Sequence, residues 1–175
     1  MSRLRFCVSA AYVWLAMVAF GGIAVETIVI YPNVFHDVPR SLTEASSFFD
    51  VTGPADFFPP MGAATLIAAV VTLLLVRKVQ PANWWFTASF TSLSLGEFLF
   101  SMLYFWPRNE TMFDEGTAVH SAELLTQTAV EFEVGHWFRL GMSTVTATLA
   151  FVGLLRLHRY ASVQTPERIT AGARS

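Results

Sequence analysis

The sequence predicts an all-α integral membrane protein built as a four-helix bundle. Hydrophobic residues make up 54% of the 175 residues and charged residues only 14%, whereas soluble domains carry about 25% charged residues. The chain contains four long apolar runs, and each reaches the roughly 20 residues that a helix needs to cross a bilayer. We therefore expect residues 1–160 to form one transmembrane domain and residues 161–175 to form a flexible cytoplasmic tail.

The first two spans are expected at residues 7–31 and 58–76. Inside the first span, the only charged residue is Glu26. Its apolar stretch exceeds the about 7 to 15 residues found in a cleaved signal peptide, so we expect this span to be retained. Pro59 and Pro60 stand at the start of the second span, where a missing backbone N–H costs little because it would be unpaired in the first turn.

The last two spans are expected at residues 82–107 and 134–157. Glu97 is the charged residue inside the third span, and His136 and Arg139 lie inside the fourth. Residues 117–134 contain no proline or glycine and lead directly into the fourth span. We therefore expect a partly helical extracytoplasmic segment before the fourth span.

The distribution of basic residues predicts the orientation. Most of the 11 lysines and arginines flank the inner ends of the spans, at Arg3, Arg5, Arg77, Lys78, Arg156, Arg159, Arg168 and Arg174. Positively charged short loops stay cytoplasmic, so both termini are expected in the cytoplasm, in a bacterial cytoplasmic membrane. No Lys/Arg-rich run is present to neutralise phosphates, which excludes nucleic acid as a partner. The expected partners are the lipid bilayer and a lipophilic small molecule.

Ionisable residues inside the spans point to a functional site, because they are costly in lipid and tend to face a bundle interior. Counted at about 1.5 Å per residue, Glu97 and Arg139 lie about 20 and 25 Å from the inner ends of their spans. Glu26 and His136 also fall in the outer half. We expect these four side chains to be catalytic candidates around one pocket, although an ion pair between Glu97 and Arg139 that only joins two helices is an alternative. The ring residues expected to bind the substrate are Trp137, Trp106 and Tyr104.

A transition-metal site is a further hypothesis. Glu133 and His136 form the Glu-x-x-His pair that di-iron carboxylate bundles use, and Glu97 and Glu26 would supply the remaining ligands. The chain has one such pair where those bundles have two. A transition metal and the absence of any cofactor therefore both stay open, because a metal demands ligand number as well as ligand type.

Three short motifs carry a family resemblance. The first span ends in Tyr31-Pro32-Asn33-Val34-Phe35, the third ends in Tyr104-Phe105-Trp106-Pro107-Arg108-Asn109, and the fourth opens with Gly135-His136-Trp137-Phe138-Arg139. In this order the motifs resemble the anthrone-oxygenase-like family of small four-span membrane proteins. The resemblance implies that molecular oxygen oxidises an activated, flat, hydrophobic phenolic ketone without metal or flavin. His136 stands where that family often has Asn.

We therefore expect a membrane-embedded oxygenase or related oxidoreductase that takes a lipophilic molecule from the outer leaflet. His136 or Glu97 would remove a proton and Arg139 would stabilise the enolate. One alternative is a non-catalytic membrane subunit that docks a membrane protein partner through residues 108–134. A small-molecule or proton transporter is the third hypothesis, and the absence of charged residues in the inner half disfavours it.

Overall fold

The computed structural model describes the backbone of residues 3–172 and the side chains of residues 3–162. Within these residues the chain forms helices joined by short turns, and no strand. The predicted all-helical class is confirmed. Four helical segments are long and apolar enough to cross a membrane: Arg3–Val34, Pro54–Val76, Gln80–Val119 and Ala122–Ser162.

Two helical segments extend beyond the expected spans, and one of them includes the segment before the fourth span that was expected to be partly helical. The third helical segment extends to Val119, and the fourth helix, α8 (Ala122–Gly172), begins well before residue 134. At its other end α8 continues to Gly172, so the backbone is helical over most of the segment expected to be a flexible tail. A formed helix adds one hydrogen bond for each residue it extends by, so growth past the packed region costs little.

The first and third spans are interrupted by wide π-helical turns. In the first, η1 (Glu26–Ile30) separates α1 (Arg3–Val25) from α2 (Tyr31–Val34). The third begins with α5 (Gln80–Thr91) and continues through η2 (Ser92–Leu99), η3 (Ser101–Phe105), α6 (Trp106–Asn109), η4 (Glu110–Glu115) and α7 (Gly116–Val119). Both η1 and η3 end just before a proline, Pro32 or Pro107. A proline ring clashes with the carbonyl one turn earlier, and a wider turn relieves that clash.

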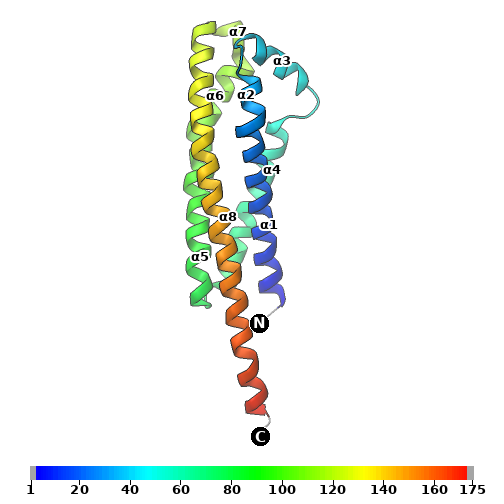
Figure 1. Cartoon of the computed structure of the whole chain (residues 1–175), viewed down its shortest axis with the longest axis vertical. Helices are drawn as coiled ribbons and strands as arrows, with labels where there is room; N and C mark the ends of the chain where they lie inside the picture. Colours follow the sequence, from blue (N-terminus) through cyan, green and yellow to red (C-terminus); the bar gives the residue numbers. More distant parts are fainter. Residues whose placement is uncertain (1–2, 173–175) are drawn as a thin grey trace.

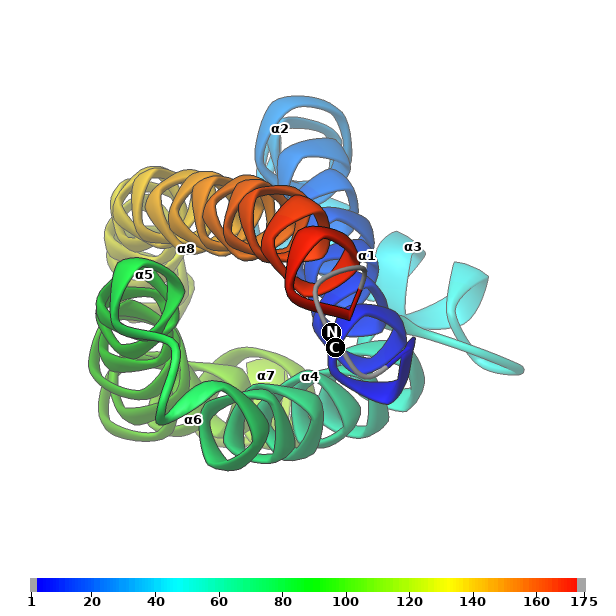
Figure 2. The same cartoon turned by 90° about the horizontal axis from the view of Figure 1, so that it is seen from below.

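The long helices lie side by side around a common axis (Figures 1 and 2). Helix α1 packs against α4 (Pro54–Val76) and α8, and α5 packs against the same two helices. The beginning of α1 and the end of α8 lie towards the same end of the molecule. Helices α2, α3 (Arg40–Phe48) and α7 lie towards the opposite end (Figure 1). We call the first the terminal end and the second the loop end.

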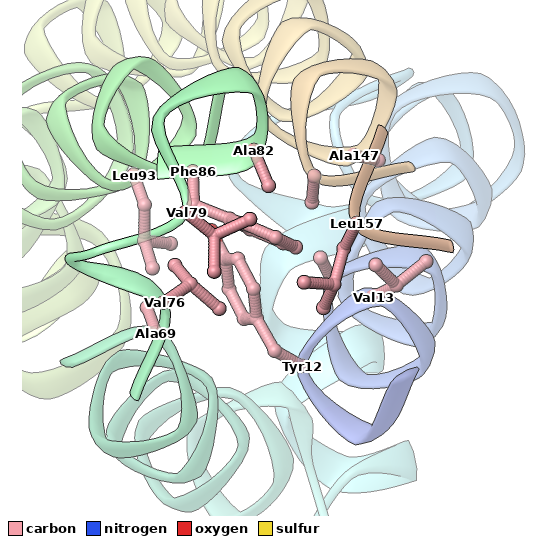
Figure 3. Packing of buried hydrophobic residues seen from close by; sticks show 12 residues of the cluster. Tyr12, Val13, Ala69, Val76, Val79, Ala82, Phe86, Leu93, Ala147 and Leu157 are labelled. Atoms are coloured by element: carbon pink, nitrogen blue, oxygen red, sulfur yellow. The ribbon is translucent and has the colours of Figure 1, made fainter. Parts of the chain in front are cut away.

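Two buried apolar clusters fill the space between the helices. The cluster near the terminal end holds Tyr12, Phe86 and Leu157, which point into the centre between the helices (Figure 3). There the Tyr12 hydroxyl lies 2.6 Å from Ser89 Oγ, and Ser89 Oγ donates to the Thr146 carbonyl at 2.8 Å. The second cluster, near the loop end, is built on Tyr31, Val34, Leu42, Phe105, Met112, Leu125, Ala129 and Phe132.

Candidate functional site

A cavity of about 920 Å³ lies in the loop-end half of the molecule. Its wall includes residues from α1, η1, α4, η2, η3 and α8. Residues of the connection from α3 to α4 line the cavity as well, towards the loop end. Four side chains that the sequence singled out as catalytic candidates line this one cavity: Glu26, Glu97, His136 and Arg139. The volume is in the range of sites that bind drug-sized molecules, about 300 to 1,000 Å³.

Glu26 stands at the first position of η1 and is 3% exposed. Its Oε1 accepts a hydrogen bond from the Tyr31 hydroxyl at 2.8 Å. Its Oε2 is buried and has no hydrogen-bond partner among the described residues. Glu26 and Tyr31 are five residues apart, a spacing that places two side chains on the same face in a π turn rather than in an α-helix.

His136 lies inside a cage of aromatic rings. Its ring centroid is 4.3 Å from that of Tyr31, 4.5 Å from that of Phe105 and 4.8 Å from that of Phe132, and the residue is 1% exposed. Thr27 Oγ1 donates to the Ile23 carbonyl at 2.7 Å and lies 3.5 Å from His136 Nδ1. Because that hydroxyl has a single hydrogen, we assign the ring hydrogen to Nδ1.

This tautomer leaves His136 Nε2 as a lone-pair acceptor. Within the described part of the chain Nε2 is buried without a hydrogen-bond partner. Buried polar atoms are nearly always paired, so an orphaned one calls for an explanation such as a missing ligand or a catalytic role. A neutral imidazole with a free nitrogen is the usual general base of enzymes.

Glu97 lies in η2, and its carboxylate contacts α8. Its Oε1 accepts a hydrogen bond from Thr146 Oγ1 at 2.6 Å. No ion pair joins Glu97 to Arg139 in the described residues, where the ion pairs are Arg40 with Glu44, Arg108 with Glu131 and His120 with Glu115. The alternative in which Glu97 and Arg139 form an interhelical salt bridge therefore has no counterpart in the structure.

Arg139 is a cation without a bonded counterion. Across the described residues it makes no hydrogen bond and no ion pair, and its Nε is buried. The guanidinium carbon lies 5.1 Å from the ring centroid of Phe58 and 5.5 Å from that of Phe105. Such cation–π contacts recover part of the cost of removing the charge from water. The charge also acts at longer range on the carboxylates of Glu26 and Glu97.

The three aromatic residues expected to hold the substrate are not gathered around the cavity. Trp106 lines it and is also 56% exposed at the surface. Tyr104 is not among the lining residues, and its hydroxyl donates to the Glu131 carbonyl at 2.8 Å. Trp137 is 60% exposed on α8 and is likewise outside the lining. On a helix, residue 137 points about 100° away from residue 136, so the two cannot share a face.

The residues proposed as metal ligands do not form a metal site here. Glu133 is only half-buried and does not line the cavity that holds His136, Glu97 and Glu26. In the part of the chain that the structure describes, no three or more His, Cys, Asp or Glu side chains come close enough together to hold a metal ion. A transition metal needs both the right donors and the right number of them, and this arrangement supplies no such set.

Four aromatic lining residues were not expected as site residues from the sequence. Tyr31, Phe58, Phe105 and Phe132 surround the polar side chains, but in a chain with 16 Phe an individual ring does not stand out. The detectable signal is that Tyr31 and Phe105, both within the motifs quoted above, precede a proline by one and two residues.

The chain matches no family model, no curated protein and no solved structure.

Proposed function

We propose that the protein is a membrane enzyme that ionises a lipophilic carbonyl compound or phenol inside the bilayer and oxidises it with molecular oxygen. The observation that carries this proposal is the unpaired Arg139 guanidinium in a cavity that also holds the free Nε2 of His136. An arginine inside a membrane span is costly, by about 2.5 to 3.5 kcal/mol at the centre of the helix, so an arginine that lines a cavity without a counterion indicates a function that uses the charge.

In the proposed reaction, His136 Nε2 accepts a proton from the acidic C–H or O–H group of the substrate. A well-placed general base contributes about 10² to 10⁴-fold to the rate. The negative charge that develops on the substrate oxygen is stabilised by Arg139, whose guanidinium lies in the cavity beside the rings of Phe58 and Phe105. Glu26, which lines the same cavity and is held by Tyr31, would receive the proton in turn.

The oxidation step uses oxygen dissolved in the membrane. For a substrate with an activated CH₂ group, one oxygen atom of O₂ becomes the new carbonyl oxygen of the substrate. The other leaves as water with the two hydrogens of the CH₂ group, so atoms and electrons balance. This is the reaction that the resemblance to the anthrone-oxygenase-like family implies, and an apolar cavity suits both O₂ and a flat ring system.

We place the cavity in the outer half of a bacterial cytoplasmic membrane, with both termini in the cytoplasm. Basic residues support this orientation, because Arg77 and Lys78 lie between α4 and α5 and Arg156 and Arg159 lie near the terminal end of α8. The acidic residues Asp56, Glu110 and Asp114 line the cavity towards the loop end. A lipophilic substrate then enters from the outer leaflet.

The competing functions have less support. A transporter needs a route through the protein, but the cavity lining stops short of the terminal end, where Tyr12, Phe86 and Leu157 are completely buried. A docking subunit would use residues 108–134, where the exposed Val119 and Leu124 offer apolar surface. In that segment, however, Arg108 and Glu131 bond to each other at 2.7 Å rather than standing free for a partner.

Oxygen uptake by the protein in lipid nanodiscs tests the proposal. With anthrone as the substrate, we expect saturable O₂ consumption matched by quinone absorbance. Arg139→Gln and His136→Ala are expected to lower kcat/KM by about 10²-fold or more while the protein stays folded. Trp137→Phe, outside the cavity on the same helix, is the matched control and keeps the activity. Equal rates in the protein, both variants and empty nanodiscs would overturn the proposal.

A further inference from the structure

Exposed residues of α4 and of the third helical segment, Pro59, Phe98 and Trp106, line the cavity, so it opens to the surface between these two elements. We call this opening the slot. On α4 the slot is lined by Pro59, Gly62 and Leu66, which follow one another at three and four residues and so lie on one face. A Cβ atom added to Gly62 would meet no atom within 4 Å. This wall is therefore shallow, and there is open space beside it.

The opposite wall belongs to η2, η3 and α6. It consists of Phe98, Met102 and Trp106, spaced every four residues. Phe98 is 43% exposed, and Trp106 is exposed as well, so the same side chains face both the cavity and the surroundings of the protein. Helix α4 packs mainly against α1 and α5 and only slightly against η2. The two walls thus flank an opening between two helical segments that are each long and apolar enough to cross a membrane.

The slot begins close to the cation. Phe58, whose ring lies 5.1 Å from the Arg139 guanidinium, precedes Gly62 by one helical turn on α4, which corresponds to about 6 Å along the axis. The partner that suits Arg139 is an oxyanion or carbonyl oxygen, whereas the slot residues are apolar apart from the indole N–H of Trp106. One molecule that satisfies both regions has an ionisable head and an apolar extension.

We infer that the substrate is an amphiphile whose ionisable head lies at Arg139 and whose hydrocarbon chain leaves the cavity through the slot between Gly62 and Met102. This inference rests on the proposed function and narrows its substrate class. A chain in the slot gains little free energy over a chain in the bilayer, because lipid tails are as apolar as the protein wall. The slot provides the space that the hydrocarbon chain occupies. Filling the slot therefore excludes molecules with such a chain and not molecules without one.

A pair of nitrophenol esters, one with a methyl and one with a dodecyl ester arm, tests this inference. The phenolate is coloured, so binding beside a cation is read from absorbance, with the protein in lipid nanodiscs. Gly62→Phe fills the slot, and Gly21→Phe is the matched control, since Gly21 is equally free of neighbours but does not line the cavity. Because all variants share one lipid, partitioning of each ester cancels in the comparison.

We expect Gly62→Phe to weaken binding of the dodecyl ester by about tenfold or more, which is about 1.4 kcal/mol, because the ring occupies the space of the chain, and to leave binding of the methyl ester unchanged. Gly21→Phe should affect neither ester. Retained binding of the methyl ester also shows that the variant is folded. If both esters are lost, Met102→Trp closes the slot from the other wall and repeats the test.

The outcomes separate this inference from the proposed function. If Arg139→Gln weakens both esters but neither slot variant discriminates between them, the head site stands and the chain assignment is overturned. If Arg139→Gln affects neither ester, the proposed site itself fails, and the chain assignment fails with it. Selective loss of the dodecyl ester in a slot variant supports both.

Discussion

Replacing Arg139 with methionine should stabilise the protein while abolishing its activity. An arginine costs about 2.5 to 3.5 kcal/mol at the centre of a membrane helix and less towards its ends. The contacts of Arg139 with Phe58 and Phe105, at 5.1 and 5.5 Å, return about 0.5 to 1 kcal/mol each. Methionine keeps the apolar stem of the side chain. At the centre of the helix the balance would be a net stabilisation of about 0.5 to 2.5 kcal/mol, and the position of Arg139 in the outer half brings it to about 1 kcal/mol. A stabilising substitution of this kind is the usual sign of a residue kept for function.

Reversible unfolding in mixed micelles, titrated with an anionic detergent, measures this change in the free energy of unfolding. Arg108→Met is the matched control, because Arg108 pairs with Glu131 at 2.7 Å and covers the Tyr104 ring at 3.7 Å. That variant should be less stable than the parent protein. If Arg139→Met is destabilised as strongly as Arg108→Met, then Arg139 has a structural partner in the membrane and the functional interpretation of its charge is wrong.

Three further variants test particular contacts. Glu133→Gln should retain full oxygen uptake because the side chain lies outside the cavity, and a loss of activity comparable to that of His136→Ala would revive the metal hypothesis. Gly96→Ala should lower the free energy of unfolding by about 1 to 3 kcal/mol, because the added Cβ would collide with Met142. An unchanged midpoint in the detergent titration would show that η2 and α8 separate easily at this contact. Tyr12→Phe removes the hydroxyl next to Ser89, and thermal unfolding should report a loss of about 1 kcal/mol.

The positions of the four charged or imidazole side chains were accessible to sequence reasoning. Each lies in an otherwise apolar run, so its depth follows from the rise per residue of a helix. Residues 136 and 139 share a face by helical spacing alone. That reasoning placed Glu26, Glu97, His136 and Arg139 in one half of the protein, and the structure lines one cavity with all four.

The aromatic walls were not accessible in the same way. Trp137 follows His136 directly in the sequence, but adjacency on a helix turns a side chain by about 100°, and Tyr104 donates to the Glu131 carbonyl instead of lining the cavity. The π turns before Pro32 and Pro107 change the spacing further. The turn η1 brings Tyr31 beside Glu26, a pair that a regular helical count separates. Phe105, at the end of η3, lies beside His136 of another helix.

By itself the sequence determined the helical class and the number of apolar helices, because the length and hydrophobicity of each run decide whether a helix can cross lipid. The tertiary structure alone decided that Arg139 has no ion-pair partner among the side chains it describes, that His136 is surrounded by aromatic side chains, and that Gly62 borders open space. Whether a charge is paired depends on distances between helices. Composition and periodicity describe one helix at a time and carry no information about such distances.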